Sequence, residues 1–135
     1  MDWRDNLIND AAQVRALIRL TRRIAVLGIK TEVQYDQPSV YVPKYLMDAG
    51  FEIVPVPVYY PEVSEIFGLP VYRRLGDIPG AVDMVDVFRR PPDIVGHIED
   101  ILAKHPQSVW FQTGIINMAA AEIFAKAGIK VVQDL

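Results

Sequence analysis

The residues best suited to binding chemistry follow a short apolar run that ends at Gly28. Lys30 and Thr31 come next, and they supply a cation and a hydroxyl group. Proteins often hold phosphate groups where a buried strand breaks at a glycine and leads into a helix, because the first N–H groups of a helix point outward. The first hypothesis is therefore a nucleotide-like ligand. The alternative is that this stretch is only the first strand–helix unit of an α/β domain.

Two further cations, Arg89 and Arg90, follow a second apolar run. Neighbouring arginines are usually solvated. At a strand end beside a phosphate site, however, we expect at least one of them to contact the ligand, because a guanidinium group matches phosphate oxygens well. The two cationic segments together favour an anionic ligand.

No catalytic group of residues stands out. The chain has no cysteine, which excludes thiolate nucleophiles, thiolate metal sites and disulfides. Asp83 and Asp86 lie three residues apart in a predicted strand, so they point to opposite faces and do not form a carboxylate pair. His97 and His105 are isolated, and no metal-ligand spacing occurs. We expect a binding module without its own catalysis, and the sequence leaves the question of an enzyme open.

Strand-like and helical patterns alternate along the chain. The predicted strands are 24–27, 51–56, 82–88, 108–111 and 129–132. Continuously apolar strands are covered on both faces, and the alternation indicates right-handed crossovers. The fold class is therefore α/β, a Rossmann-like three-layer α/β/α sandwich with a mostly parallel sheet. The simplest strand order is 3-2-1-4-5, which would put a ligand between the strands that end at Gly28 and Phe111.

Helical periodicity gives the remaining elements. Residues 1–21 are expected to hold a leading amphipathic helix, capped by Asp10, whose apolar stripe packs on the sheet edge or on a partner subunit. A second helix follows Ser39. Pro43 would fall just past its first turn, so this helix is expected to begin one or two residues later or to open with an irregular turn. Residues 62–67 suggest a short helical turn, and further helices are expected to begin at Pro91 and at Asn117.

The composition limits the class of protein. A chain of 135 residues with 51% hydrophobic residues suits one domain over 1–135. A net charge of −3 without a basic block argues against nucleic acid as a partner. The sequence lacks the pattern of a signal peptide and a run of membrane-spanning length, so a cytoplasmic protein without membrane contact is expected. The apolar stripe of the leading helix is compatible with a homodimer.

The nicotinamide cofactors fit this sequence poorly. A dinucleotide fold that binds NAD normally carries three glycines in its first turn and an acid after its second strand. Here one glycine, Gly28, is followed by Ile29, and the second strand ends at Val56 and Pro57 with no acid. The sequence therefore favours another phosphate-bearing ligand. An NAD(P)- or nucleotide-sensing regulatory Rossmann domain remains the alternative.

Several stretches together carry a resemblance to a known family. They are 38–39 with 44–46, 50–56, 82–91, 109–115 and 127–132. The chain resembles the small stand-alone CoA-binding domain family, which is similar to the CoA-binding Rossmann domain of succinyl-CoA synthetase α subunits. The resemblance runs from about Ile24 to the end, and the sequence VDVFRRP at 85–91 is its most specific part.

The resemblance implies that CoA or an acyl-CoA, a small-molecule ligand, binds across the strand ends. The diphosphate would lie at the first loop and the adenosine beside the end of the second strand, with the third and fourth strand ends as walls. The implied binding residues are Gly28, Ile29, Lys30, Thr31, Ser39, Val40, Val56, Pro57, Phe88, Arg89, Arg90, Pro91, Gln112, Thr113 and Gly114. The family usually reads PVNP after the second strand, where this chain reads PVPV and so lacks the amide side chain.

Overall fold

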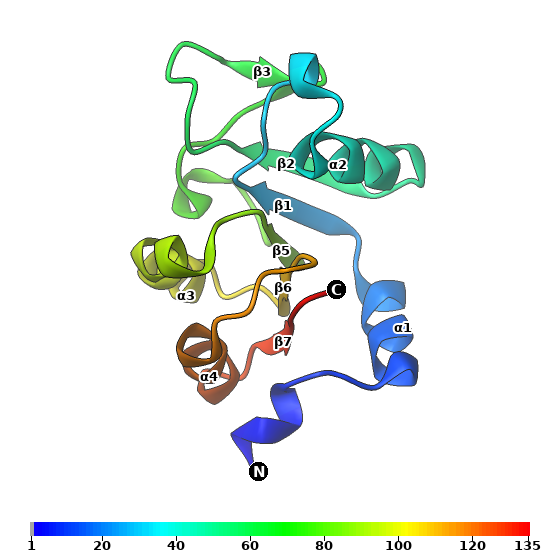
Figure 1. The fold of residues 1–135 in the computed structure, drawn as a ribbon, viewed down its shortest axis with the longest axis vertical. Helices are drawn as coiled ribbons and strands as arrows, with labels where there is room; N and C mark the ends of the chain where they lie inside the picture. The colour runs from blue at the N-terminus through cyan, green and yellow to red at the C-terminus, as the bar shows by residue number, and fades with distance from the viewer. Residues whose placement is uncertain (1) are drawn as a thin grey trace.

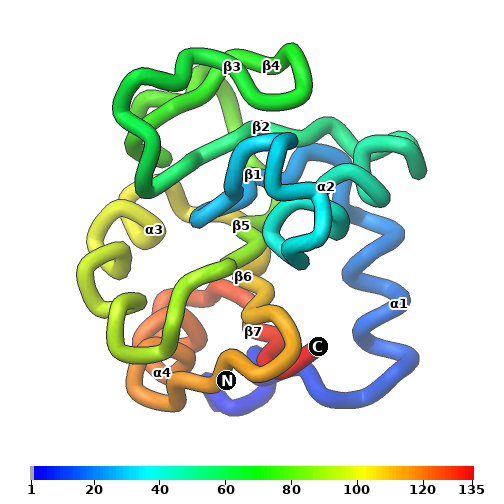
Figure 2. The backbone as a smooth tube through the Cα atoms, turned by 45° about the horizontal axis from the view of Figure 1, so that its top comes forward, coloured from blue at the N-terminus to red at the C-terminus, as the bar shows by residue number. Residues whose placement is uncertain are grey.

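A five-stranded parallel sheet forms the centre of the computed structural model, which describes residues 2–135 (Figure 1). Its strands are β1 (Arg23–Leu27), β2 (Glu52–Val56), β5 (Met84–Val87), β6 (Ser108–Phe111) and β7 (Lys130–Val132). The helices α1 (Ala11–Leu20) and α2 (Pro38–Asp48) lie on one face, and α3 (Ile98–Lys104) and α4 (Met118–Lys126) lie on the other (Figure 2). The predicted Rossmann-like three-layer sandwich is confirmed.

The strands lie in the order β2-β1-β5-β6-β7, so the predicted order 3-2-1-4-5 is wrong. Contacts outside the strands explain why β5 pairs with β1. The carboxylate of Asp83 accepts the N–H groups of Arg22 and Arg23, at 3.0 and 2.9 Å. The guanidinium group of Arg23 donates to the carbonyls of Pro79 and Ala81. These bonds hold the start of β5 beside the start of β1, and the chain order reverses between these two strands.

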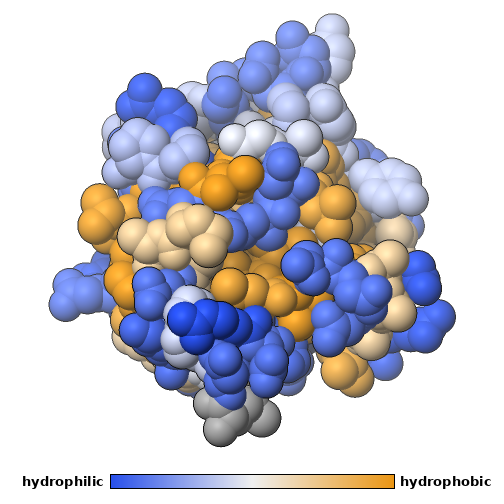
Figure 3. Space-filling model, turned by 60° about the horizontal axis from the view of Figure 1, so that its bottom comes forward, coloured by the Kyte–Doolittle hydropathy of each residue, from blue (hydrophilic) through white to orange (hydrophobic). Residues whose placement is uncertain are grey.

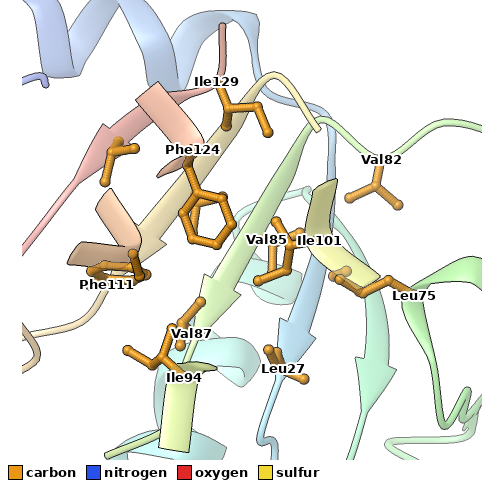
Figure 4. Packing of buried hydrophobic residues seen from close by; sticks show 14 of the residues in the cluster. Leu27, Leu75, Val82, Val85, Val87, Ile94, Ile101, Phe111, Phe124 and Ile129 are labelled. Carbon is orange, nitrogen blue, oxygen red and sulfur yellow. The ribbon is translucent and has the colours of Figure 1, made fainter. Parts of the chain in front are cut away.

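Two apolar clusters hold the helix layers on the sheet. The larger cluster packs α3 and α4 against one face (Figure 4). In it, the rings of Phe111 and Phe124 meet edge to face with their centroids 6.4 Å apart. The second cluster packs α1 and α2 against the other face, and it includes Leu17, Val26 and Ile53. Burying a side chain of this size contributes about 1.5–3 kcal/mol, so both layers are firmly attached.

The leading helix α1 begins after Asp10, where the predicted cap places its start. Residues 3–6 form a separate 3₁₀ helix, η1 (Trp3–Asn6). The side chain of Asp10 accepts the N–H of Gln13 at 3.2 Å, as the predicted cap requires. Leu17 is buried against the chain's own sheet, whereas Ile18 is 38% exposed. The apolar stripe is therefore largely used within the chain.

One other local prediction is wrong, and the structure corrects the type of helix in a second. Residues 62–67 form no helical turn and instead enter a hairpin of β3 (Glu65–Ile66) and β4 (Leu69–Pro70). Phe67 and Gly68 make its turn, both with positive φ, as tight hairpins require. The helix predicted to begin at Pro91 opens as the 3₁₀ helix η4 (Pro91–His97) and becomes an α-helix only at Ile98.

Some apolar side chains remain at the surface. Figure 3 shows apolar surface between hydrophilic residues on one face of the molecule. Leu20 on α1 and Val95 in η4 are 68% and 69% exposed. Scattered apolar residues of this kind are normal on protein surfaces, so the homodimer stays a prediction. None of the helices within residues 2–135 is long and apolar enough to cross a membrane.

Candidate functional site

The carboxyl ends of β1 and β5 meet at Gly28 and Phe88. The N–H of Phe88 donates to the carbonyl of Leu27, and the N–H of Gly28 donates to the carbonyl of Val56, both at 2.9 Å. Gly28 has φ +91°, and a Cβ atom there would collide with the carbonyl oxygen of Phe88. Glycine is therefore required, because the exits of the two strands approach closely here. The strand order also reverses at this point, and ligands bind at such points in parallel sheets.

A cavity of about 690 Å³ lies at this edge of the sheet. It is bounded by the loop after β1, the first turns of α2, and the exits of β5 and β6. Its lining residues are Lys30, Gln37, Pro38, Ser39, Tyr41, Val42, Phe88, Arg89, Arg90, Pro91, Gln112, Thr113, Gly114 and Ile115. The sequence placed the crevice between β1 and β6. The structure puts β5 between them, and the exits of all three strands contribute to the cavity.

A proline inside α2 ties the loop after Gly28 to this helix. Pro43 has no N–H to donate to the carbonyl of Ser39, four residues earlier. That carbonyl accepts the N–H of Lys30 instead, at 3.4 Å. The helix begins at Pro38, whose ring favours the first helical position, so the later start predicted from Pro43 is wrong.

Lys30 and Arg90 are the cations of the cavity with the fewest partners. Lys30 is half-buried, and its side chain has no hydrogen bond or ion pair among residues 2–135. Arg90 is exposed and pairs through its Nε with Asp93 at 2.9 Å. Such an exposed pair is worth at most about 1 kcal/mol, so a phosphate group competes with it readily. The N-cap residue of α2, Gln37, forms no capping hydrogen bond with its side chain.

Arg89 is held by the protein itself. Its side chain is 15% exposed, and its Nε donates to Nε2 of His97 at 3.1 Å. The guanidinium group also lies over the ring of Tyr59, 5.7 Å from the centroid. Burial, and then the charge of Arg89, lower the pKa of His97, so the imidazole stays a neutral acceptor. Arg89 therefore shapes the cavity wall rather than standing free in it.

The other predicted binding residues lie outside the lining of this cavity. Four of them are buried, namely Ile29, Val40, Val56 and Pro57. Gly28 stands at the strand exit but does not line the cavity. The hydroxyl of Thr31 contacts Oε1 of Gln34 at 3.2 Å in the cap of η2 (Glu32–Gln34), and this residue lines a different surface depression. The adenosine contacts predicted for Val56 and Pro57 stay predictions.

The sequence reasoning missed the N-cap residue of α2, three lining residues on this helix and one residue after β6. These are Gln37, Pro38, Tyr41, Val42 and Ile115. Pro38 is the sequence feature that could have revealed them, because proline is favoured at the first position of a helix. A helix that starts there brings its first turns to the strand ends. No group of three or more His, Cys, Asp or Glu that could hold a metal ion occurs in the part of the chain that the structure describes.

Residues 22–135 match the model of the family described as "CoA binding domain". The chain belongs to this CoA-binding domain family. The family resemblance seen in the sequence is thereby confirmed. Within the family's fold, the strand exits described above form the edge at which the candidate site lies.

Two relatives match this chain over nearly its whole length. The uncharacterized protein YneT of Bacillus subtilis (strain 168) is 33% identical over 92% of this chain and 88% of its own. A solved structure from Thermus thermophilus, called cell-free ID.343, is 34% identical with a TM-score of 0.84, and covers 93% of this chain and 92% of its own.

A larger enzyme shares the fold. Acetyl-coenzyme A synthetase 1 from Ca. Korarchaeum cryptofilum, solved with phosphate and ADP, matches with a TM-score of 0.67 and 18% identity. The match covers 85% of this chain and 26% of that enzyme chain. At this identity the likeness describes the fold alone.

Proposed function

We propose that this protein holds coenzyme A or an acyl-CoA in the cavity at the carboxyl ends of β1, β5 and β6. The observation that carries the proposal is the meeting of Lys30 and Arg90 with the first turn of α2 around one cavity of about 690 Å³. The volume lies within the roughly 300–1,000 Å³ common for cofactor sites. Cations and helix N–H groups suit the diphosphate and the 3′-phosphate.

The other walls fit the uncharged parts of the same ligand. Phe88, Pro91 and Ile115 offer apolar surface, and Gln112 and Thr113 offer hydrogen-bonding side chains. This mixture suits a molecule with charged phosphates at one end and a pantetheine arm at the other. We propose Lys30 and Arg90 as phosphate contacts and assign Arg89 to shaping the wall. A cytoplasmic location and the absence of a catalytic role stay predictions.

The test is calorimetric titration with CoA, dephospho-CoA, NAD and NADP. We expect CoA to bind and the nicotinamide cofactors to bind much more weakly or not at all. Tight binding of NAD or NADP with no binding of CoA would support the alternative, a nucleotide-sensing regulator, and overturn the proposal. Weaker binding of dephospho-CoA than of CoA would indicate that a cation contacts the 3′-phosphate.

Charge variants locate the site. Lys30→Ala is expected to weaken CoA binding about tenfold to a hundredfold, since a hydrogen bond to a charged group contributes about 1.5–3 kcal/mol. Arg90→Ala is expected to act in the same direction. The control is Arg15→Ala, which removes the same charge from the exposed face of α1, outside the cavity. Equal affinities for all three variants would remove Lys30 and Arg90 from the site.

A further inference from the structure

A second cavity, of about 540 Å³, lies on the face of the sheet that α1 and α2 cover. Its walls are mainly apolar. Ile18 and Leu46 come from the helices, Phe51 precedes β2, and Ile24, Met84 and Trp110 come from the sheet. No lysine or arginine among the described residues lines it. A cavity of this size and lining suits an apolar small molecule or an apolar part of a larger one.

The two cavities adjoin. Val42, Gln112 and Thr113 line both of them. Val42 lies in the second turn of α2, and the other two residues follow β6 directly. A ligand in the first cavity therefore has a neighbouring apolar space within reach around Gln112.

The second cavity contains a buried carboxyl group. Asp86, one residue before the end of β5, lines this cavity and is 2% exposed. Its Oδ1 accepts a hydrogen bond from Nε2 of Gln112 at 2.5 Å, whereas its Oδ2 has no partner among residues 2–135. A buried polar atom normally has a partner, because leaving it unpaired costs about 1–3 kcal/mol. The free Oδ2 is thus a place where a ligand atom would be stabilised.

Burial also decides the charge of this group. It raises the pKa of Asp86 to about 7, against the opposing hydrogen bond from Gln112. A protonated carboxyl group is a hydrogen-bond donor, and its natural partner is a carbonyl oxygen. A second carboxylate would be unfavourable here, since no lysine or arginine among the described residues lines the cavity to neutralise it.

We propose that the second cavity receives the apolar acyl group of an acyl-CoA whose nucleotide part lies in the first cavity, with Asp86 beside the thioester carbonyl. This inference rests on the proposed function and narrows its ligand class. The acyl group is an uncharged chain of several carbons, because the walls are apolar and a carboxylate-bearing acyl group would meet the buried carboxyl of Asp86.

A chain-length series tests the inference directly. CoA, acetyl-CoA, butanoyl-CoA, hexanoyl-CoA and octanoyl-CoA are titrated by calorimetry at one pH. We expect the affinity to rise by up to about fourfold for each added methylene until the cavity is full. Equal affinities across the series overturn this inference and leave CoA binding intact. No binding of CoA or of any thioester overturns both proposals.

A cavity-filling variant tests whether the acyl chain lies in the second cavity. Ile18→Trp enlarges a partly exposed side chain that lines the second cavity but not the first. This variant is expected to bind CoA with unchanged affinity. Its affinity for acyl-CoA is expected to rise much less with the length of the acyl chain than that of the wild type. The matched control is Ile123→Trp on α4, which is also partly exposed but lies on the opposite helix layer. A chain-length gain that survives in Ile18→Trp contradicts the inference.

Trp110 provides a reporter inside the cavity. The chain has two tryptophans, and Trp3 lies in η1 and does not line the cavity, so Trp3→Phe leaves Trp110 as the only tryptophan. Octanoyl-CoA is expected to shift its emission, and CoA is not. Octanoate without CoA tests whether the cavity binds free fatty acids. If octanoate shifts the emission at the same concentration as octanoyl-CoA, the cavity binds free fatty acids, and the acyl-CoA assignment is wrong.

Discussion

The side-chain amide of Gln112 donates to Oδ1 of Asp86 across 2.5 Å, and this bond joins the exit of β6 to the buried part of β5. Gln112 lines both cavities, whereas Asp86 lines only the second. The pair therefore forms the boundary between a cationic region and an apolar one. Protonation of the Asp86 carboxyl group also affects the stability of the fold.

Asp86 is expected to make the protein less stable as the pH rises. Its folded-state pKa, about 7, lies above the ordinary value of 3.8, so the folded state binds the extra proton between these values. The stabilisation is complete below about pH 4 and is lost as the pH rises through 7. The loss is of the order of a few kcal/mol, because each pH unit is worth about 1.4 kcal/mol. Urea unfolding between pH 4 and 8 measures it.

Asp86→Asn is the matched control for that measurement. The amide keeps an acceptor for Gln112 and has no proton to lose, so this part of the pH dependence should disappear. Unfolding free energies of the wild type and the variant that change in parallel with pH would contradict the assignment to Asp86.

His97 is expected to have the opposite effect on stability. Burial and Arg89 lower its pKa from the ordinary value of 6.5, so the unfolded state binds the proton more readily. The resulting stabilisation is present above pH 6.5 and is lost as the pH falls through the folded-state pKa. His97→Gln retains an acceptor for the Nε of Arg89 and should unfold without this loss. A variant that is destabilised by acid as much as the wild type would show that another group is responsible.

Gly28→Ala is expected to destabilise the fold by about 2–5 kcal/mol, through backbone strain at positive φ and overlap with the carbonyl of Phe88. Gly50→Ala separates the two causes. Gly50 also has positive φ, +102°, but a Cβ atom there would have no atom within 4 Å. Denaturant unfolding should therefore give a clearly larger loss for Gly28→Ala. Equal losses would mean that the close approach to Phe88 is unimportant.

Asn117 links α4 to the wall of the candidate site. Its Oδ1 accepts the N–H of Ala120 at 3.0 Å, and its Nδ2 donates to the carbonyl of Pro91 at 2.9 Å. Asn117→Ala removes both bonds and should cost about 1–3 kcal/mol, or roughly 3–10 °C in Tm.

Asn117→Asp is the control for the helix cap. Aspartate keeps the acceptor of the cap but not the donor to Pro91, so a smaller loss of Tm is expected. If Asp destabilises the protein as much as Ala does, the bond to Pro91 rather than the cap is the dominant contribution.

Much of the site could be recognised from the sequence because it follows strand ends. Lys30, Arg90 and Gln112 stand directly after apolar runs, and parallel strands bring such positions to one edge. The contribution of α2 was misjudged, since the sequence cannot reveal that Lys30 uses the carbonyl left free by Pro43. The second cavity was missed entirely, because its walls come from distant segments that each look like ordinary core.

The sequence by itself determined the five central strands, the positions of the main helices and the fold class. Apolar runs, helix caps and glycines are local signals, and the alternation of strands with helices requires a parallel sheet. Only the tertiary structure decided the strand order. Both edges of β1 offer the same backbone hydrogen-bonding groups, so local pattern cannot choose between its neighbours. The choice follows contacts such as that of Asp83 with Arg23, 60 residues apart, and it brings the exits of β1 and β5 together at Gly28 and Phe88.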